Sequence, residues 1–250
     1  MKKIIAIALS ALMLACAFCG CSKSADEKSK QAEKSSEVAA TETMETVLNT
    51  AEYTLYQNIF YNDTADDYDG KPANKDGIFT KIHDAYSGVE RYYVWGYNDQ
   101  TKCCDWQWEL KIDDASSLPP CGSRISVQGT YEVNEKGLDG FWIINPKITV
   151  KSKLAEKDAD IDMQSMSNTL ERVQVINIVN FPDEFEGKSV CGYGRVLDES
   201  TLEDAYYDGS WTIQISGDYE LPAFGTLVLV EGIVSGGAIT DCTISENTIY

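Results

Sequence analysis

The amino-acid sequence predicts a mainly β protein in which one small β-barrel is built twice. A Leu-Pro-Pro-Cys-Gly segment at residues 118–122, followed by Gly129, returns as Leu-Pro-Ala-Phe-Gly at residues 221–225, followed by Gly232. Apolar and polar residues alternate on both sides of each copy, which is the period of a half-buried strand. A repeat of this kind outranks every other signal in a single sequence and predicts two all-β units in tandem.

The first unit is expected to hold five strands behind a short helix at residues 44–60. Its second strand has the sharpest pattern, because an apolar face alternates with a largely polar one. The repeated turn and a polar loop at residues 135–139 separate the later strands. The five expected strands span residues 92–97, 103–112, 125–130, 141–144 and 147–150.

The second unit follows the same order with four or five strands. Asn168, with Glu171 three residues later, forms a capping-box-like start for a helix that ends near Asn180. One stripe of that helix is apolar and is expected to be buried: Leu170, Val173, Ile176 and Val179. The expected strands span residues 190–196, 211–215, 226–234 and 238–244, with a Ser-Gly-Gly hairpin turn before the last.

Each unit has short strands with glycine in its first and third strands, and this pattern resembles the OB-fold, a small barrel whose coiled strands bend at such glycines. The resemblance covers residues 92–150 and 188–244. The segment Phe-Glu-Gly-Lys-Ser-Val at residues 185–190, with Gly194 downstream, is similar to the entry to strand one in tRNA-anticodon-binding-like OB modules of bacterial envelope proteins. This resemblance implies two tandem OB-like barrels. Small SH3-like barrels and a lipocalin-like fragment remain alternatives.

The first residues follow the pattern of an export signal. Lys2 and Lys3 precede an apolar run at residues 4–18, which is too short to span a bilayer permanently. Cys21 resembles the lipid-attachment cysteine of bacterial lipoproteins, and Cys16 is the competing site. This resemblance implies a lipid-anchored protein on the extracytoplasmic face of the cell membrane, with the membrane as a partner. Ordinary secretion and a retained anchor are the alternatives.

The local composition of the chain predicts the boundaries of its domains. Residues 21–43 hold mainly Ser, Lys, Glu and Ala and no aromatic residue, so we expect a disordered stalk behind a signal peptide at residues 1–20. The charged segment 151–166 lacks Gly and Pro and is expected to be a linker. The first OB-like domain then covers residues 44–150 and the second covers residues 167–250.

The net charge of −19, from 40 acidic and 21 basic residues, would repel a phosphate backbone. Nucleic acid is therefore not an expected partner. The chain also holds none of the short motifs of hydrolases, nucleotide-binding proteins or zinc proteases, and its single histidine argues against most catalytic triads. We expect no enzyme and no cofactor, with Zn²⁺ or Ca²⁺ as the candidates if a metal is bound.

The cysteines supply the candidate metal site. Cys103 and Cys104 are adjacent, and such a pair in a predicted OB strand resembles the Cys-Cys segment of envelope proteins associated with metal permeases, which implies metal or redox handling. His83 could be a third ligand. The alternative is that Cys104 packs in the core beside Trp106 while Cys103 pairs elsewhere, since metal sites usually show a second pair of ligands.

Other cysteines could form disulfides. Cys191 and Cys242 fall in the first and last strands of the second unit and would be bridged if those strands lie close. Cys103 or Cys104 with Cys121 would tie the first unit. With Cys21 lipidated, an odd number of cysteines remains, so at least one stays unpaired or bonds between chains. Reduced, buried thiols are the alternative.

The acidic loop at residues 63–76 is a weak match to the EF-hand template. Asp67, Asp69 and Asp76 fall at the third, fifth and twelfth places, whereas Ala65 stands at the first. The sequence therefore predicts either a Ca²⁺ loop at these three aspartates or a loop that is merely solvated.

Aromatic residues offer the candidate ligand surface. Tyr93, Trp95 and Tyr97 share one face of their strand and could form a platform for sugars or peptides, or fill the core. We therefore expect a lipid-anchored extracytoplasmic binding or scaffolding module. Its alternatives are an envelope metal-handling protein that uses Cys103 and Cys104 and a cell-wall carbohydrate binder, with an envelope protein or a glycan as partner.

Overall fold

The structure, a computed structural model, describes residues 46–62, 64–137, 140–153, 159–206 and 209–246. The predicted signal peptide, Cys16, Cys21 and the predicted stalk all lie outside the described residues. The described residues all belong to one compact unit. Among the described residues no helix is both long and apolar enough to cross a membrane.

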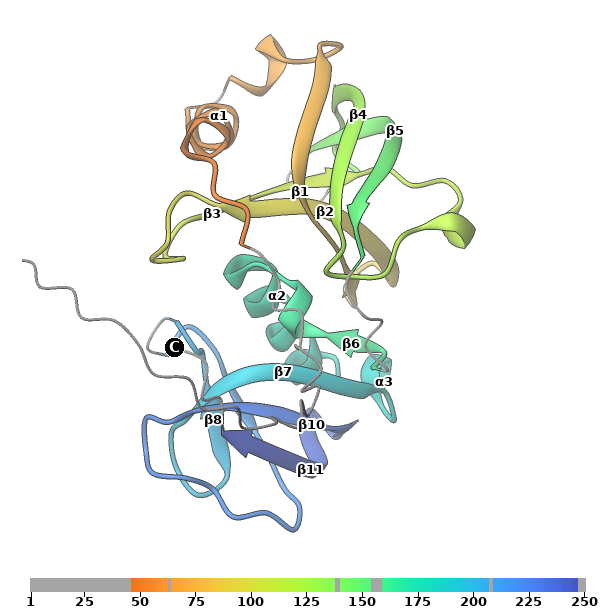
Figure 1. The fold of residues 1–250 in the computed structure, drawn as a ribbon. Coiled ribbons are helices and arrows are strands. Elements are labelled where there is room, and N and C mark those ends of the chain that lie inside the picture. Colours follow the sequence, from red (N-terminus) through yellow and green to blue (C-terminus); the bar gives the residue numbers. More distant parts are fainter. Residues whose placement is uncertain (1–45, 63, 138–139, 154–158, 207–208, 247–250) are drawn as a thin grey trace, which may run out of the picture. The chain divides into compact units, whose positions relative to one another are not determined.

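The first sheet closes into a five-stranded barrel (Figure 1). Its strand order is β1-β2-β3-β5-β4, and every pairing is antiparallel except the contact of β3 with β5 at Leu110 and Ile143. Helix α1 (Thr50–Tyr61) packs against β3. The strands are β1 (Pro72–Asp84), β2 (Val89–Tyr97), β3 (Asp105–Leu110), β4 (Arg124–Val133) and β5 (Phe141–Ser152). Two 3₁₀ turns, η1 (Ala65–Asp67) and η2 (Ala115–Ser117), lie in its loops.

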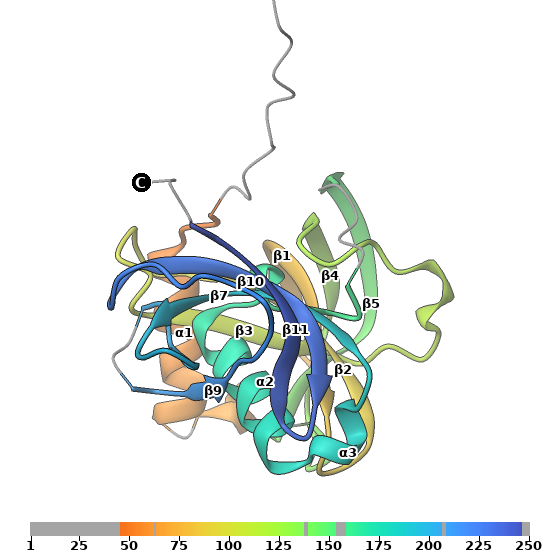
Figure 2. The same ribbon diagram turned by 90° about the horizontal axis from the view of Figure 1, so that it is seen from below.

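The second sheet has the same cyclic strand order as the first, with β7, β8, β9, β11 and β10 in the places of β1, β2, β3, β5 and β4. Its path is β11-β10-β7-β8-β9, and a parallel bridge from Ile215 to Ile239 brings the end of β9 to β11. In Figure 2, β10 and β11 run side by side as a hairpin. The strands are β7 (Ser189–Val196), β8 (Thr201–Glu203), β9 (Thr212–Gln214), β10 (Leu227–Ser235) and β11 (Ala238–Glu246). A short extra strand, β6 (Ile161–Asp162), pairs parallel to β7. The mainly β class and the two OB-like barrels are thus confirmed.

The repeated turn has the same hydrogen bonds in both barrels. Gly122 has φ 83° and donates its N–H to Phe79 O at 2.7 Å, and Gly225 has φ 80° and donates to Val196 O at 2.8 Å. Both glycines adopt the left-handed backbone that a side chain disfavours. The sequence repeat therefore encodes one conformation twice.

The second glycine of each repeat marks a close approach of two strands. A Cβ on Gly129 would lie 2.5 Å from Ile143 Cγ2, and one on Gly232 would lie 2.7 Å from Ile239 Cγ2. The strand register shifts at both glycines, as expected for β-bulges. Glycine lets each strand coil tightly enough to close a small barrel.

Three strand predictions need correction. The first strand of the first barrel is β1, whereas residues 92–97 belong to β2. The segments 141–144 and 147–150 are one strand, β5, which continues through an irregularity where Asn145 has φ 50°. Strand β8, with only three residues, was not predicted. β1 was missed because its first half is rich in charged residues, a composition that is typical of a loop. Pairing with both β2 and β4 overrides this local preference for a loop.

Helix α2 (Asn168–Asn180) spans the predicted residues, but its cap and buried face differ. Ser167 is the N-cap, and its hydroxyl accepts from the Leu170 N–H. In the predicted stripe, Ile176 and Val179 are 38% and 44% exposed. The buried face instead includes Gln174, because α2 packs against β1 and its polar side chains bond with that strand. A further short helix, α3 (Pro182–Phe185), precedes β7.

The segment just before α2 also packs against the first barrel. The residues that follow β6 form a 3₁₀ turn, η3 (Met163–Ser165), where a linker was expected. The Ser165 hydroxyl lies 2.9 Å from the buried hydroxyl of Thr80 on β1. Met163 and Met166 are buried. This segment thus covers part of the β1–β2 surface.

Candidate functional site

A cleft of about 520 Å³ opens beside the β1–β2 hairpin. We name it the hairpin cleft and define it by the parts of the chain that line it: the hairpin, the loop at residues 115–121, residues 159–162, Met166, Gln174 of α2 and Lys188. It is the natural candidate for a ligand site, since small-molecule and peptide sites are concave and combine apolar walls with a few placed polar groups.

Two cross-strand pairs of the hairpin form one wall of the cleft. Lys81 is paired with Tyr92 and His83 with Glu90 in the register of β1 and β2. His83 Nδ1 lies 3.0 Å from Glu90 Oε1, and the Tyr92 ring stacks on Phe79 with centroids 6.2 Å apart. Because successive strand residues alternate in direction, Lys81 and His83 point to the same side of β1.

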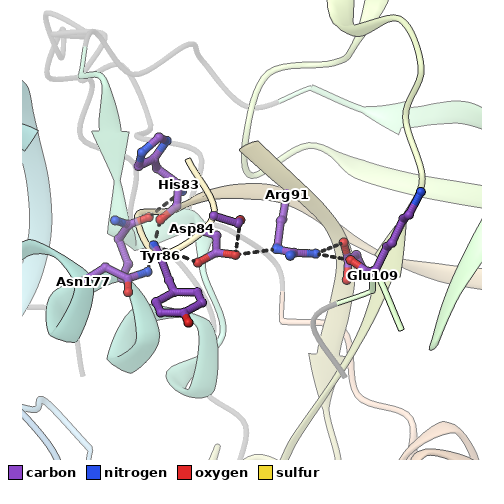
Figure 3. Close-up of polar contacts among 9 residues, drawn as sticks. His83, Asp84, Tyr86, Arg91, Glu109 and Asn177 are labelled. Atoms are coloured by element: carbon purple, nitrogen blue, oxygen red, sulfur yellow. Dashed lines mark hydrogen bonds and ion pairs between the residues drawn. The ribbon is translucent and has the colours of Figure 1, made fainter. Parts of the chain in front are cut away.

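Helix α2 holds the backbone of His83 from the other side. Gln174 Oε1 accepts the His83 N–H at 3.0 Å, and Asn177 Nδ2 donates to the His83 carbonyl at 3.1 Å. These two bonds fix the position of His83 relative to the helix (Figure 3). A β-strand backbone bonded by two helix side chains is a rigid base for a site.

Two buried nitrogen atoms on the cleft wall lack a hydrogen-bond partner within the described residues. They are Gln174 Nε2 and His83 Nε2. Gln174 is only 1% exposed, and His83 Nε2 lies 3.6 Å from the Glu184 carboxylate, beyond hydrogen-bond distance. A buried polar atom without a partner costs about 1–3 kcal/mol. A ligand that supplies the partners would recover this free energy.

The cleft carries charges of both signs. Lys81 and Lys188 lie on its wall together with Glu90 and Asp160. The backbone N–H and the hydroxyl of Ser189 both donate hydrogen bonds to Asp160 and lower its pKa, the N–H more than the hydroxyl. This carboxylate is therefore ionised at neutral pH. At the apolar end, burial raises the pKa of the Cys121 thiol. A strongly anionic or strongly cationic ligand would find no matching field here.

An ion-pair network fixes the far end of the hairpin (Figure 3). Arg91 Nε lies 3.0 Å from Asp84 Oδ2, and its Nη1 lies 2.8 Å from Glu109 Oε1. Burial raises the pKa of Asp84, but hydrogen bonds from Ser87 and Arg91 outweigh it, and the net pKa is lowered. The network joins β1, β2 and β3, and so holds the hairpin that forms the cleft wall.

The predicted aromatic platform is covered by the chain itself. Tyr93, Trp95 and Tyr97 are 1%, 1% and 4% exposed. Trp95 Nε1 donates to Ser165 O, and the Tyr97 hydroxyl donates to Asn168 Oδ1, each at 2.8 Å. These rings are therefore not an open ligand surface, because η3 and α2 lie on them.

The cysteine pair lies in a bend just before β3, not in the strand. Cys103 is exposed, and Cys104, predicted to pack inward beside Trp106, is only partly buried. His83 contacts Glu90 and Phe185 instead of the thiols. Across the described residues, no three or more His, Cys, Asp or Glu side chains are grouped to hold a metal ion. The structure thus does not bring His83 to the pair.

The acidic loop does not form a Ca²⁺ loop in the described residues either. Asp67 lies in η1, and Asp76 lies in β1 opposite Ser126. Asp69 Oδ1 accepts the N–H of Val133 at 2.9 Å. The three aspartates are separated because β1 extends through the second half of the predicted loop.

No disulfide joins Cys191 to Cys242 among the described cysteines. Strand β10 lies between β7 and β11, and two strand spacings of about 4.8 Å each exceed the Cα separation of roughly 7 Å that a disulfide tolerates. The Cys242 thiol donates to Ile239 O and the Cys191 thiol to Gln164 Oε1. Cys103, Cys104 and Cys121 are also free thiols, so the predicted tie within the first barrel is not formed.

Gln174 and Lys75 are among the buried polar residues that the sequence analysis missed. Gln174 falls beside the expected apolar stripe, and its polarity at a helix face flanked by Val173 and Val175 was the available signal. Lys75 is 4% exposed, pairs with Glu52 and lies 4.5 Å from the Trp108 ring centroid. No local pattern distinguishes such a buried lysine from an exposed one.

Comparisons with known proteins give fold-level matches alone. No family model and no curated protein matches the chain. Solved structures of asparaginyl-tRNA synthetase from Pyrococcus horikoshii match at 16% identity and a TM-score of 0.25, over 36% of this chain and 22% of that one. The same enzyme complexed with asparaginyl-adenylate matches with the same identity and score over 37% of this chain. The chain spans about a fifth of the length of these synthetase chains.

The prediction that nucleic acid is not a partner is not upheld: the matched structures are, by name, those of an asparaginyl-tRNA synthetase. The exclusion rested on net charge, which sums over the whole chain and does not describe any local surface. It is therefore withdrawn. The matches themselves assign no ligand to this chain.

Proposed function

We propose that the protein is a lipid-anchored extracytoplasmic binding module without catalytic activity, in which two OB-like barrels present the hairpin cleft to a ligand. Its support is of two kinds. The pattern of residues 1–21 is that of a lipoprotein signal, and the cleft combines the features of a ligand site.

The single observation that carries the binding role is the buried amide of Gln174. Its oxygen accepts the His83 N–H, while its buried Nε2 has no hydrogen-bond partner within the described residues, and Gln174 is one of the residues that line the cleft. Buried polar groups are usually hydrogen-bonded, so a buried donor without a partner calls for an explanation. An oxygen atom of a ligand would accept the hydrogen bond that Gln174 Nε2 can donate.

The chemistry of the wall favours a peptide segment as ligand. A peptide offers carbonyl oxygens for Gln174 Nε2, and its backbone also carries groups that can form a hydrogen bond with His83 Nε2. Lys81 and Glu90 can pair with side chains of either sign. Pro119 and Pro120 add an apolar surface.

The binding role can be tested with peptides selected by phage display on the purified chain. Gln174→Met keeps the length of the side chain and removes the amide. We expect selected peptides to bind this variant about tenfold or more weakly, as for one lost hydrogen bond to a buried donor. Gln128→Met, at an exposed position of β4, is the matched control and should bind as the parent does. Equal binding by all three proteins would place the ligand elsewhere.

The anchor can be tested by metabolic labelling of producing cells with radioactive palmitate. We expect label in the chain and in Cys16→Ala, and none in Cys21→Ala. Label that persists in Cys21→Ala and disappears in Cys16→Ala would move the attachment site. A chain that is never labelled would refute the anchor and leave the cleft proposal standing.

A further inference from the structure

The turn that joins β2 to β3 brings two thiols into contact. Cys103 Sγ lies 3.4 Å from Cys104 Sγ. Neighbouring residues of an extended strand point to opposite sides, which would keep such thiols apart. Here both cysteines precede the first residue of β3 and follow Lys102, which has φ 56°. The bend places both side chains on the same side.

The two thiols differ in access. Cys103 is exposed, and its sulfur lies 3.1 Å from the Thr101 hydroxyl oxygen. Cys104 is partly buried beside Tyr53 of α1. The hydrogen bond with Tyr53 lowers the pKa of Cys104, but burial and the Cys103 thiol outweigh it, so the net pKa is raised. Cys103 is therefore the thiol that an external reagent reaches first.

We propose that Cys103 and Cys104 form a redox modification site, at which a reversible disulfide between the two adjacent residues is made by exchange with an external disulfide. The proposal does not rest on the proposed function. It rests on the sulfur contact, the exposure of Cys103 and the absence of a third metal ligand within the described residues.

The exchange takes two steps. Cys103 loses its proton, and its thiolate attacks one sulfur of the external disulfide, which releases one thiolate and leaves a mixed disulfide on Cys103. Cys104 then loses its proton, and its thiolate attacks Cys103 Sγ and expels the second thiolate. The two cysteines have lost two protons and two electrons, and the external disulfide has become two thiols.

The site lies where the first barrel meets α2. Asn168 Nδ2 donates to the Lys102 carbonyl, and Asp105 accepts both the N–H and the hydroxyl of Thr169, each at 2.7 Å. Closing an eight-membered ring at Cys103 and Cys104 changes the backbone between these two anchors. We therefore expect oxidation to speed hydrogen exchange of the Thr169 amide.

The experiment uses the reduced, purified chain and oxidised glutathione as the external disulfide. After incubation the reaction is quenched with acid, and the protein is alkylated with N-ethylmaleimide and digested. The masses of the peptides are then measured by mass spectrometry. We expect the peptide that holds Cys103 and Cys104 to lose two hydrogen atoms, to escape alkylation and to recover both thiols with dithiothreitol. Cys191→Ser, at a buried thiol, should behave in the same way.

Variants separate the outcomes. Cys104→Ser should stop at a glutathione adduct on Cys103, whereas Cys103→Ser should react slowly because Cys104 is less exposed. In the parent chain, a stable glutathione adduct on Cys103 with Cys104 alkylated would overturn the proposal. So would two alkylated thiols. Binding of Cu⁺ by the reduced chain that blocks the exchange would replace the redox role with a metal role.

Discussion

The indole Nε1 of Trp95 donates a 2.8 Å hydrogen bond to the carbonyl oxygen of Ser165, 70 residues later in the chain. Trp95 belongs to β2, and Ser165 closes η3 in the segment expected to be a linker. This contact explains why the aromatic face of the first barrel is not open. The chain covers that face itself, and the hairpin cleft lies where the cover ends.

The close approach at Gly129 should make that position intolerant of a side chain. In Gly129→Ala the new Cβ would lie 2.5 Å from Ile143 Cγ2 and 2.8 Å from the Ile144 carbonyl, so backbone must move. We expect a loss of about 1–3 kcal/mol in the free energy of unfolding, as for overpacking. Urea denaturation measures it. The exposed neighbour Gln128→Ala serves as control, and equal midpoints for both variants would refute the bulge argument.

The Arg91 network should stabilise the fold in a pH-dependent way. Because the folded pKa of Asp84 lies below its ordinary 3.8, its contribution is complete above that value and is lost as the pH falls through the folded pKa. We expect Arg91→Met to cost about 3 kcal/mol near neutral pH and much less once the pH falls below the folded pKa of Asp84.

Thermal unfolding at several pH values checks this expectation. Lys111→Met is the control, because Lys111 lies 3.9 Å from Asp113 in a pair whose side chains are 44% and 82% exposed. Such a pair contributes little, about 0–1 kcal/mol. An Arg91→Met effect that is small, or that stays constant down to pH 2, would show that the network does not stabilise the hairpin.

Lys75 should be coupled to Glu52. Burial lowers the pKa of Lys75, while Glu52 favours its charged form, and the ammonium also faces the rings of Trp108 and Tyr131. Lys75→Met leaves the Glu52 carboxylate without its lysine, so we expect a loss of about 2–4 kcal/mol. Adding Glu52→Gln should restore at least half of it. Additive effects of the two substitutions would rule out the coupling.

The sequence predicted the features that repeat or alternate. Gly122 with Gly225, and Gly129 with Gly232, mark the same turn and bulge in both barrels because only glycine fits these backbones. Trp106 and Trp108 are 0% and 1% exposed, as expected for the apolar face of their strand. Such features depend on local geometry that a sequence carries directly.

Features that depend on distant contacts were missed. β1 contains Lys75 and Asp76, and a buried charged residue is visible only when Glu52 and the rings of β3 and β4 are placed around it. Gln174 is buried because it bonds the backbone of His83, 91 residues earlier. The cleft is lined by several segments that lie far apart in the sequence, so it could not be predicted from any one of them.

The central claim is that the hairpin cleft binds a ligand through the Gln174 amide. The most direct measurement follows the ¹H and ¹⁵N resonances of that side-chain amide by NMR while a selected peptide is added. We predict a saturable shift of the Gln174 Nε2 resonances together with slower hydrogen exchange, and changes at His83. Saturable binding that leaves both residues unchanged would contradict the account.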